Sequence, residues 1–322
     1  MELDSIDMRI LGELQYHFPL TKTPYKDTAE KLGVHTDFLL ERLRNLASAG
    51  VVKRVGFYLN YKAKKLKAAL IAVRVNGGIN RIIEAVRSDN YTTHAYLRDH
   101  PVYNVWIVSK RKTREELIEL AGRLAGEAGT DKWTVLFGVK TWKLSVKYDL
   151  ERGISKSAWN HVVPPENPPA LSDEEYRIAS KLRRLPLEER PYRTIGSELS
   201  VDEDYVYNTM ISLLEKGALG DPGAALDGGK IGFKENVMLM AQPGRGGYED
   251  LCRCLSRAEY TTHVVQREEY PLGSCRYKCY AMVHAVDKQR LETVIGEIVD
   301  RCRPSSWLRV KSIRDLKPGV VR

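Results

Sequence analysis

The feature that most constrains this chain is an internal repeat. The letters PLTKTPY at residues 19–25 return as PLEERPY at residues 186–192, 167 positions later. The tetrapeptide YTTH stands at residues 91–94 and again at residues 260–263, 169 positions apart. Landmarks that recur in the same order at nearly one offset indicate two copies of one folding unit. The chain must therefore fold as a pair of similar halves.

Each half opens with the periodicity of short helices. Ile6, Ile10 and Leu14 recur at steps of four, as the buried stripe of a helix does. Two further short helices follow, and the third ends at Gly50, whose counterpart in the second half is Gly217. Three short helices with a glycine turn predict a helix-turn-helix in each half.

The remainder of each half alternates between strand and helix patterns. In the first half we expect strands at 68–75, 92–97, 102–109 and 133–147, and helices at 79–87 and 113–125. The second half gives the same βαββαβ order between residues 236 and 313. The fold class is therefore α+β, a tandem repeat of a winged helix-turn-helix and a ferredoxin-like βαββαβ domain.

A proline-rich segment separates the halves. The predicted domains are helix-turn-helix 1 at 1–60, α+β domain 1 at 61–151, the linker at 152–170, helix-turn-helix 2 at 171–228 and α+β domain 2 at 229–322. Such a chain resembles a heterodimer made into one polypeptide, so we expect a pseudo-twofold pair. Further oligomerisation stays open.

Composition narrows the class of protein. The N-terminal residues lack the pattern of a signal peptide and no apolar run approaches about 20 residues, so we expect a cytoplasmic protein without membrane contact. The five cysteines are an odd number, which favours reduced, buried thiols over a disulfide framework, and we expect no metal site. The net charge of +9 favours an acidic partner, either nucleic acid or a polycarboxylate.

The charges of the third helices argue against DNA. Residues 36–46 hold two acidic and two basic side chains, whereas residues 201–213 hold three acidic residues and no basic one. A helix that reads DNA has to approach phosphates, so a net charge of −3 would repel the duplex. We therefore expect these modules to serve in packing and dimerisation. Of the two wings, only the first offers cations, Lys53 and Arg54, where the second has Gly220 and acidic Asp221.

Polar residues with useful chemistry gather after the YTTH segments. Alternate strand residues share a face, so His94, Tyr96, Arg98 and His100 would line one side of an unbroken strand. A guanidinium, a phenol and imidazoles on one face form an anion-binding, proton-donating surface. His17, His35 and His161 lie outside this pattern, and we expect no functional role for them.

Several motifs resemble those of the siroheme decarboxylases and the related heme d1 biosynthesis proteins, which are Lrp/AsnC-like. FPLTKTPY at 18–25 is similar to their F-P-L-x-x-x-P-Y, and RDHPVYNVWI at 98–107 resembles R-[DE]-H-x-Y-N-x-W-F with one extra residue. The second half is similar to H-C-Y-x-R-x-x-Y-P-x-W-P-Y followed by M-[IV]-H. Its matching residues are His263, Arg267, Tyr270, Pro271, Tyr277 and the MVH of 282–284. It departs from that motif at residues 272–276 (LGSCR), where the tryptophan is missing.

The resemblance implies removal of the carboxyl groups from two acetate side chains of siroheme. This would yield 12,18-didecarboxysiroheme on the way to heme or heme d1. It implies no added cofactor, with iron present only as part of the substrate. One histidine as an axial ligand of that iron stays open. The alternative function is an Lrp/AsnC-like transcription regulator whose α+β domains bind a small effector.

For this reaction we expect His100 to donate the proton, Arg98 to hold a carboxylate, and Tyr103 and Trp106 to form a dry wall. The predicted catalytic residues are His100, Arg98 and His263. The predicted substrate-binding residues are Arg98, Tyr103, Trp106, His94, Arg54, Arg267, Tyr277 and His284.

Overall fold

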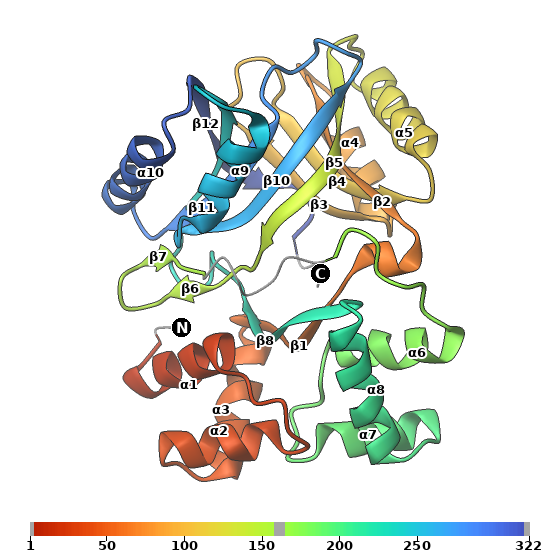
Figure 1. Cartoon of the computed structure of the whole chain (residues 1–322), viewed down its shortest axis with the longest axis vertical. Coiled ribbons are helices and arrows are strands. Elements are labelled where there is room, and N and C mark those ends of the chain that lie inside the picture. Colours follow the sequence, from red (N-terminus) through yellow and green to blue (C-terminus); the bar gives the residue numbers. More distant parts are fainter. Residues whose placement is uncertain (1–2, 158–164, 319–322) are drawn as a thin grey trace. The chain divides into compact units, whose positions relative to one another are not determined.

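The helix-turn-helix segments of both halves come together in one unit of the structure, and the strands of both α+β domains come together in another (Figure 1). In this computed structural model, which describes residues 3–157 and 165–318, unit 1 takes its residues from Met1–Lys64 and Ser145–Lys234. Unit 2 takes them from Lys65–Leu144 and Glu235–Arg322. The five expected domain limits remain predictions. His161 and part of the 152–170 linker lie outside the described residues.

Unit 1 holds the two predicted helix-turn-helix modules. Its helices are α1 (Ser5–Tyr16), α2 (Pro24–Leu32) and α3 (Thr36–Ser48) from the first half and α6 (Asp173–Leu182), α7 (Pro191–Leu199) and α8 (Glu203–Glu215) from the second. Capping boxes start both first helices, through Asp4 with Asp7 and through Ser172 with Glu175. A proline begins each second helix, at the position where its missing N–H costs least. No helix of the described residues is long and apolar enough to cross a membrane.

The third helix of each module contacts the other module. In α3, the Arg44 guanidinium donates to the Leu187 carbonyl oxygen at 2.8 Å. In α8, the Tyr207 hydroxyl donates to the Leu20 carbonyl oxygen at 2.8 Å. Leu20 and Leu187 are equivalent residues of the repeated PL motif. The motif therefore supplies the acceptor carbonyl through which each copy holds the other.

The wings of the two modules pair with each other as an antiparallel ribbon. Strands β1 (Val52–Leu59) and β8 (Leu219–Leu226) place Gly56 opposite Gly223. Gly56 has a φ of +151° and a Cβ there would lie 2.6 Å from the Leu182 carbonyl oxygen of α6. Gly223 has a φ of +124° and its Cβ would collide with the Leu14 carbonyl oxygen of α1. Each glycine thus lets the first helix of the other half approach its wing.

Unit 2 contains two ferredoxin-like domains, which confirms the predicted fold class. The first consists of β2 (Lys67–Val73), α4 (Ile79–Ser88), β3 (Thr92–Arg98), β4 (Val105–Arg111), α5 (Arg114–Glu127) and β5 (Trp133–Leu144). The second consists of β9 (Glu235–Gln242), α9 (Tyr248–Arg257), β10 (Thr261–Tyr270), β11 (Cys279–Ala285), α10 (Lys288–Cys302) and β12 (Ser306–Asp315). The strand orders β5-β2-β4-β3 and β12-β9-β11-β10 are the same when counted within each half.

The two sheets close on each other into a barrel. Edge strand β3 pairs with β12, and edge strand β10 pairs with β5, both antiparallel. The two contacts are equivalent, because each joins the second strand of one half to the fourth strand of the other. Together with the pairings inside each half, they form a ring of eight strands without a free edge. The halves therefore pack as the pseudo-twofold pair that the repeat predicts.

Two buried lysines reinforce this pairing reciprocally. Lys143 lies near the C-terminal end of β5. Its ammonium group donates to the Ala258 carbonyl oxygen, 2.9 Å away, at the C-terminus of α9. Lys317 donates to the Asp89 carbonyl oxygen, 2.6 Å away, at the C-terminus of α4. An ammonium group at a helix C-terminus satisfies carbonyls and interacts favourably with the helix dipole. Each half therefore caps a helix of the other.

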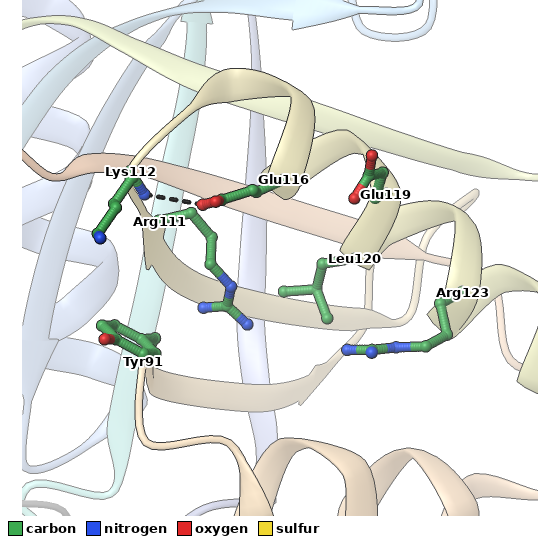
Figure 2. Close-up of a pocket in the computed structure, with 7 residues that line it drawn as sticks. All are labelled: Tyr91, Arg111, Lys112, Glu116, Glu119, Leu120 and Arg123. Atoms are coloured by element: carbon green, nitrogen blue, oxygen red, sulfur yellow. Dashed lines mark hydrogen bonds between the residues drawn. The ribbon is translucent and has the colours of Figure 1, made fainter.

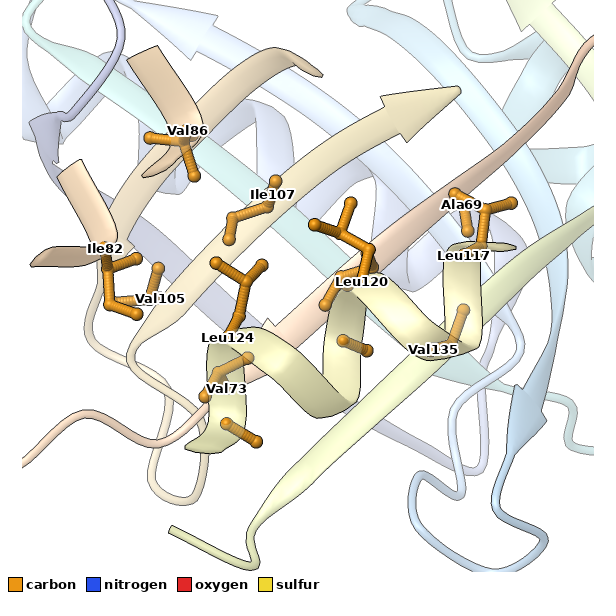
Figure 3. Close-up of a cluster of buried hydrophobic side chains, with 14 of the residues drawn as sticks. Ala69, Val73, Ile82, Val86, Val105, Ile107, Leu117, Leu120, Leu124 and Val135 are labelled. Carbon is orange, nitrogen blue, oxygen red and sulfur yellow. The ribbon is translucent and has the colours of Figure 1, made fainter. Parts of the chain in front are cut away.

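The strands have two differently packed faces. In the first half, α4 and α5 cover one face, and Figure 3 shows Leu117, Leu120 and Leu124 of α5 directed at strand residues such as Val135. The intervening strand residues point to the opposite face, inside the ring. There one buried cluster combines side chains of both halves: Leu70, Ala72, Tyr103, Trp106, Leu136, Met238, Met240, Cys275, Tyr277, Tyr280 and Val310. We call this cluster the lumen core.

The cysteines differ from the sequence prediction. Disulfides join Cys252 to Cys279 and Cys254 to Cys302, with a Cα–Cα distance of 5.7 Å in each case. Residues two apart on α9 point in different directions, so Cys252 meets β11 while Cys254 meets α10. The expectation of reduced thiols is therefore wrong for these four, and Cys275 alone among the described cysteines is a buried free thiol.

Candidate active site in the barrel

Strand β3 presents the predicted polar face to the inside of the barrel. Ala95 and Leu97 pack with the helix-covered core, so the alternate residues His94, Tyr96 and Arg98 point the other way. The rings of His94 and Tyr96 lie 6.4 Å apart, and the Arg98 guanidinium lies 5.0 Å from the Tyr96 ring centre. The structure therefore brings these three together.

Arg98 is a buried cation. It is 5% exposed, its Nη1 donates to the Val310 carbonyl oxygen at 3.3 Å, and burial lowers its pKa to about 10. The adjacent carboxylate of Asp99 accepts a hydrogen bond from the Lys311 backbone N–H instead. Among the residues that the structure describes, no acidic side chain forms an ion pair with Arg98. A buried charge in this state gains strongly from an anionic ligand.

His100 is not on the strand, which corrects one sequence expectation. Strand β3 ends at Arg98 and β4 begins at Val105, so His100 lies in the connecting loop. Its Nδ1 accepts hydrogen bonds from the backbone N–H groups of Val102 and Tyr103, at 3.1 and 3.0 Å. Nδ1 is therefore unprotonated, and the proton of the neutral ring lies on Nε2. Burial lowers the pKa of His100 to about 4, with Asp99 opposing the shift.

Tyr103 and Trp106 form the expected wall beside His100. The His100 ring stacks on Tyr103 with 5.6 Å between centres and meets Trp106 edge-on at 5.1 Å. The indole N–H of Trp106 donates to the Tyr103 carbonyl oxygen at 2.9 Å. Both side chains belong to the lumen core, where they are 6% and 1% exposed. His100 therefore lies against an apolar surface.

The second half repeats part of this arrangement. Arg267 donates from Nη1 to the Leu136 carbonyl oxygen at 3.1 Å and lies 5.6 Å from the Tyr280 ring centre. Tyr277 is buried, and its carbonyl oxygen accepts from the Tyr280 hydroxyl at 2.9 Å. This last contact is the counterpart of the bond from Trp106 to Tyr103, 174 positions earlier.

One histidine of the second half, His284, lies near Arg98. The Nε2 atom of His284 lies 3.3 Å from the Thr262 hydroxyl, and Thr262 also lies within 3.4 Å of His263 Nδ1. The pKa of His284 is lowered to about 3, mainly by burial and also by the nearby His263 and Arg98. His284 and Arg98 therefore share an environment built from both halves. His263 is half-buried and lies near His284.

Arg54 lies elsewhere. It belongs to β1 of unit 1, where it is 8% exposed. Burial lowers its pKa to about 10, Asp221 opposes this shift, and Arg183 and Arg184 add to it. The structure therefore does not unite Arg54 with the barrel residues, and its part in binding stays a prediction.

Two residues near His100 were missed by the sequence reasoning. The Ser274 carbonyl oxygen accepts from the Tyr103 hydroxyl at 3.0 Å, and the Ser274 hydroxyl lies 2.7 Å from that of Thr134. Ser274 lies in residues 272–276, where the second half departs from the family motif. That departure was the available signal.

A surface pocket of about 510 Å³ lies apart from these residues. It is lined by Tyr91, Arg111, Lys112, Glu116, Glu119, Leu120 and Arg123 around α5, and none of them is a predicted site residue (Figure 2). Within the described residues, no three His, Cys, Asp or Glu side chains are grouped as metal ligands. Because the outer pocket contains none of the predicted site residues and the barrel interior contains most of them, the barrel interior is the better candidate site.

Comparison with known proteins agrees with this architecture. A model of the AsnC-like ligand binding domain matches residues 66–143 and 230–317, and a model of the siroheme decarboxylase NirDL-like HTH domain matches residues 7–52. A siroheme decarboxylase NirG subunit of Paracoccus pantotrophus is 35% identical over 132 residues, which are 41% of this chain and 83% of that protein. The chain belongs to the siroheme decarboxylase family.

Other family members align over most of the chain. A siroheme decarboxylase of Hydrogenobacter thermophilus is 25% identical over 312 residues, or 96% of this chain and 92% of that protein. Crystal structures of the siroheme decarboxylase NirDL, alone and with an iron-uroporphyrin III analogue, match with a TM-score of 0.66 at 21% identity. They cover 96% of this chain and 91% of theirs, so the tandem fold is shared.

Proposed function

We propose that this chain decarboxylates siroheme and converts two of its acetate side chains to methyl groups. The observation that carries the proposal is Arg98, a guanidinium buried in the barrel without an acidic partner among the described residues. The names of the relatives, which are siroheme decarboxylases and their subunits, support the same reaction.

The chemistry sets three requirements. Each step consumes one proton, because R–CH2–COO⁻ and H⁺ become R–CH3 and CO2. The carbon–carbon bond breaks, its electron pair passes into the pyrrole system, and the proton finally occupies the vacated position on the methylene carbon. The site therefore has to hold a carboxylate, exclude water around the spreading charge, and deliver a proton.

Arg98 meets the first requirement. Its planar guanidinium can form two parallel hydrogen bonds to one carboxylate, and its burial strengthens the attraction. We assign it to the carboxylate of an arm that enters the barrel. Arg267, His94, Tyr277 and His284 are proposed to contact other polar groups of the substrate.

Tyr103 and Trp106 meet the second requirement. They adjoin Met238 and Met240 in the lumen core, which presents apolar atoms to any arm lying next to His100. Because buried side chains occupy this interior, we propose that an acetate arm, which is smaller than the macrocycle, is the part of the substrate that reaches Arg98. Exposed apolar residues on the two hairpin loops, Val102 and Leu272 at 43% and 88%, offer a surface for the flat ring outside.

His100 is proposed to meet the third requirement, with His263 as the second catalytic histidine. In the ligand-free protein His100 is neutral at pH 7, because its pKa is about 4. A substrate that carries several carboxylates stabilises the imidazolium, so its pKa rises on binding. The imidazolium carries a proton on both ring nitrogens, so Nδ1 gives up the hydrogen bonds from Val102 and Tyr103 when the ring becomes charged, and Nε2 is the proposed proton donor. No added cofactor belongs to this proposal.

The test is an anaerobic assay with siroheme. Adding siroheme to the protein should shift its absorption spectrum, and mass spectrometry should find a product that has lost two CO2 molecules. Arg98→Ala should reduce both signals, whereas Arg123→Ala, a change in the outer pocket, should leave both unchanged. If the parent protein neither shifts the spectrum nor releases CO2, the proposed function is wrong.

A further inference from the structure

Two disulfides fasten α9 to its neighbours in the second half. The inner disulfide joins Cys252 to Cys279 at the start of β11, and the outer disulfide joins Cys254 to Cys302 at the end of α10. Both cysteines of the inner disulfide are 0% exposed, whereas both cysteines of the outer one are partly exposed. Because thiol–disulfide exchange needs direct attack on a sulfur atom, a reductant in solution reaches the outer disulfide first.

The first half shows that the fold does not require these bonds. Helices α4 and α9 are 169 positions apart, and β4 and α5 stand 174 positions before β11 and α10. The equivalents of the inner pair are therefore Ile83 and Val105. Those of the outer pair are Ala85 and Ala128. All four belong to the apolar core of the first half or pack against it. Apolar contacts thus suffice where the second half has covalent bonds.

The outer disulfide lies next to both strands with which the second half closes the barrel. Helix α9 leads into β10, which pairs with β5 of the first half. Cys302 is the last residue of α10 and stands four residues before Ser306, where β12 begins. Strand β12 pairs with β3 of the first half. The outer disulfide therefore holds together the two segments that lead into the strand pairs between the halves.

Helix α9 also carries contacts to the first half. The carbonyl oxygen of Ala258, at the C-terminus of α9, accepts a hydrogen bond from the Lys143 ammonium at 2.9 Å. The Arg253 guanidinium lies 5.6 Å from the ring centre of Trp142 in β5. Because the outer disulfide ties α9 to α10, breaking this bond lets α9 shift against β5. Reduction of the outer disulfide should therefore loosen the pairing of the halves.

We infer that the outer disulfide is a redox-sensitive lock on barrel closure, which a small dithiol opens. On opening, the dithiol passes two electrons and two protons to the sulfur atoms of Cys254 and Cys302, which become thiols, and the dithiol closes its own disulfide. The inner disulfide stays intact, because its sulfur atoms are out of the reductant's reach. This inference is independent of the proposed decarboxylation.

Thiol alkylation, with the products read by mass spectrometry, tests the order of opening. The full chain is equilibrated with mixtures of oxidised and reduced dithiothreitol, and its thiols are then blocked with iodoacetamide. As the mixtures become more reducing, two alkyl groups should appear together, on Cys254 and Cys302. Cys252 and Cys279 should react only after denaturant is added. The inference is wrong if all four react together, if the inner pair opens first, or if the outer disulfide is absent at the oxidising end.

The first half supplies matched replacements for a second test. The variant Cys254→Ala/Cys302→Ala removes the outer disulfide and copies the alanines of the first half. The variant Cys252→Ile/Cys279→Val removes the inner disulfide and copies the isoleucine and valine. Thermal unfolding is measured with and without dithiothreitol. The outer disulfide closes a loop with a sequence separation of 48. In the parent, the reductant should therefore lower the unfolding midpoint by about 5–15 °C.

The two variants should respond differently to the reductant. The variant without the outer disulfide should have the low midpoint in both conditions, and the variant without the inner one should keep the parent's shift. Hydrogen exchange should become faster in α9, β10 and β12 of the parent on reduction, with α4 and α5 unchanged. A parent with equal midpoints and equal exchange in both conditions, or a shift that persists without the outer disulfide, would overturn the inference. If the variant without the inner disulfide does not fold, the other variant and the alkylation order decide the question.

Discussion

Arg98 and Arg267 each donate a hydrogen bond from Nη1 to a backbone carbonyl in the fourth strand of the other α+β domain, at 3.3 Å to Val310 and 3.1 Å to Leu136. The two arginines therefore join the edge strands that close the barrel and also face its interior. The same two side chains therefore contribute to the proposed substrate binding and to the pairing of the halves. A substitution at either arginine is therefore expected to affect both substrate affinity and stability.

Replacing Arg98 should weaken siroheme binding. Arg98→Ala removes a charge-assisted fork, so binding should fall by about 1.5–3 kcal/mol, which is roughly 10- to 150-fold in Kd. Arg98→Lys should restore only part of this, because the ammonium lacks the planar fork. Anaerobic spectrophotometric titration measures the affinities. The thermal unfolding midpoint reports how far loss of the hydrogen bond to Val310 destabilises the protein. Unchanged siroheme affinity in Arg98→Ala would show that Arg98 does not bind the substrate.

His100→Asn should preserve binding and lose rate. The pKa of about 4 in the free protein means that His100 gains its proton only after the substrate's carboxylates have bound. The pH profile of kcat should therefore show a group titrating above pH 4 that is absent from the variant. Stopped-flow absorbance between pH 4 and 8 provides the profile. Identical profiles for parent and variant would show that another group donates the proton.

Stability should fall in acid because of His284. In the folded protein the pKa of His284 is about 3, whereas a histidine of the unfolded chain has the ordinary value of 6.5. Between these values the unfolded state binds more protons, so the free energy of unfolding decreases as pH falls from 6.5 towards 3. His284→Gln, whose amide can still contact Thr262, should reduce that slope by at most about 1.4 kcal/mol per pH unit. Urea unfolding at a series of pH values tests this, and an unaltered slope contradicts it.

The wing glycines should not tolerate a side chain. Gly56→Ala places Cβ 2.6 Å from the Leu182 carbonyl oxygen at a φ of +151°, so we expect a loss of about 2–4 kcal/mol in unit 1. Gly12→Ala is the matched control, because it lies in α1 with nothing within 4 Å of its Cβ. The control should be neutral or stabilising by up to about 1 kcal/mol. Equal unfolding midpoints for the two variants would contradict the close approach.

The protein should not bind DNA specifically. The third helices are engaged between the modules, with Arg44 bonded to Leu187 and Tyr207 bonded to Leu20. Asp204 on α8 is paired with Lys22 at 2.5 Å, and the net charge of residues 201–213 is negative. Fluorescence anisotropy with duplexes at moderate salt should show no sequence preference. A specific complex that weakens steeply with salt would revive the regulator alternative.

The sequence predicted the elements well because they depend on local signals. Periodicity located the helices, and the repeat supplied an independent copy of each prediction. The sequence predicted a turn between the strands at 92–97 and 102–109, but it grouped His100 with the face of the first strand on the condition that this strand is unbroken. In the structure the hydrogen bonds from Val102 and Tyr103 to His100 close a turn there. Alternation alone does not show where a strand ends.

Other features depend on contacts between distant residues. The bond between Tyr103 and Ser274 joins residues 171 positions apart, and no local pattern encodes it. Cys252 and Cys279 likewise become neighbours only when α9 packs on β11. The burial that lowers the pKa of His100 and His284 is also a property of the closed barrel. Sequence reasoning named these histidines but gave no means of deriving their protonation.

Closure of the barrel also has a consequence during synthesis. One edge of strand β3 pairs with β4, and the other edge finds its partner only in β12, whose first residue, Ser306, is made about 200 residues after Arg98. At roughly 5–20 residues per second, a ribosome takes on the order of 10–40 s to reach it. During that interval the edge of β3 is exposed, and such an edge is a template for aggregation. The first half therefore waits for the second before its sheet is protected, so the rate of translation and the chaperones at the ribosome bear directly on the yield of this protein.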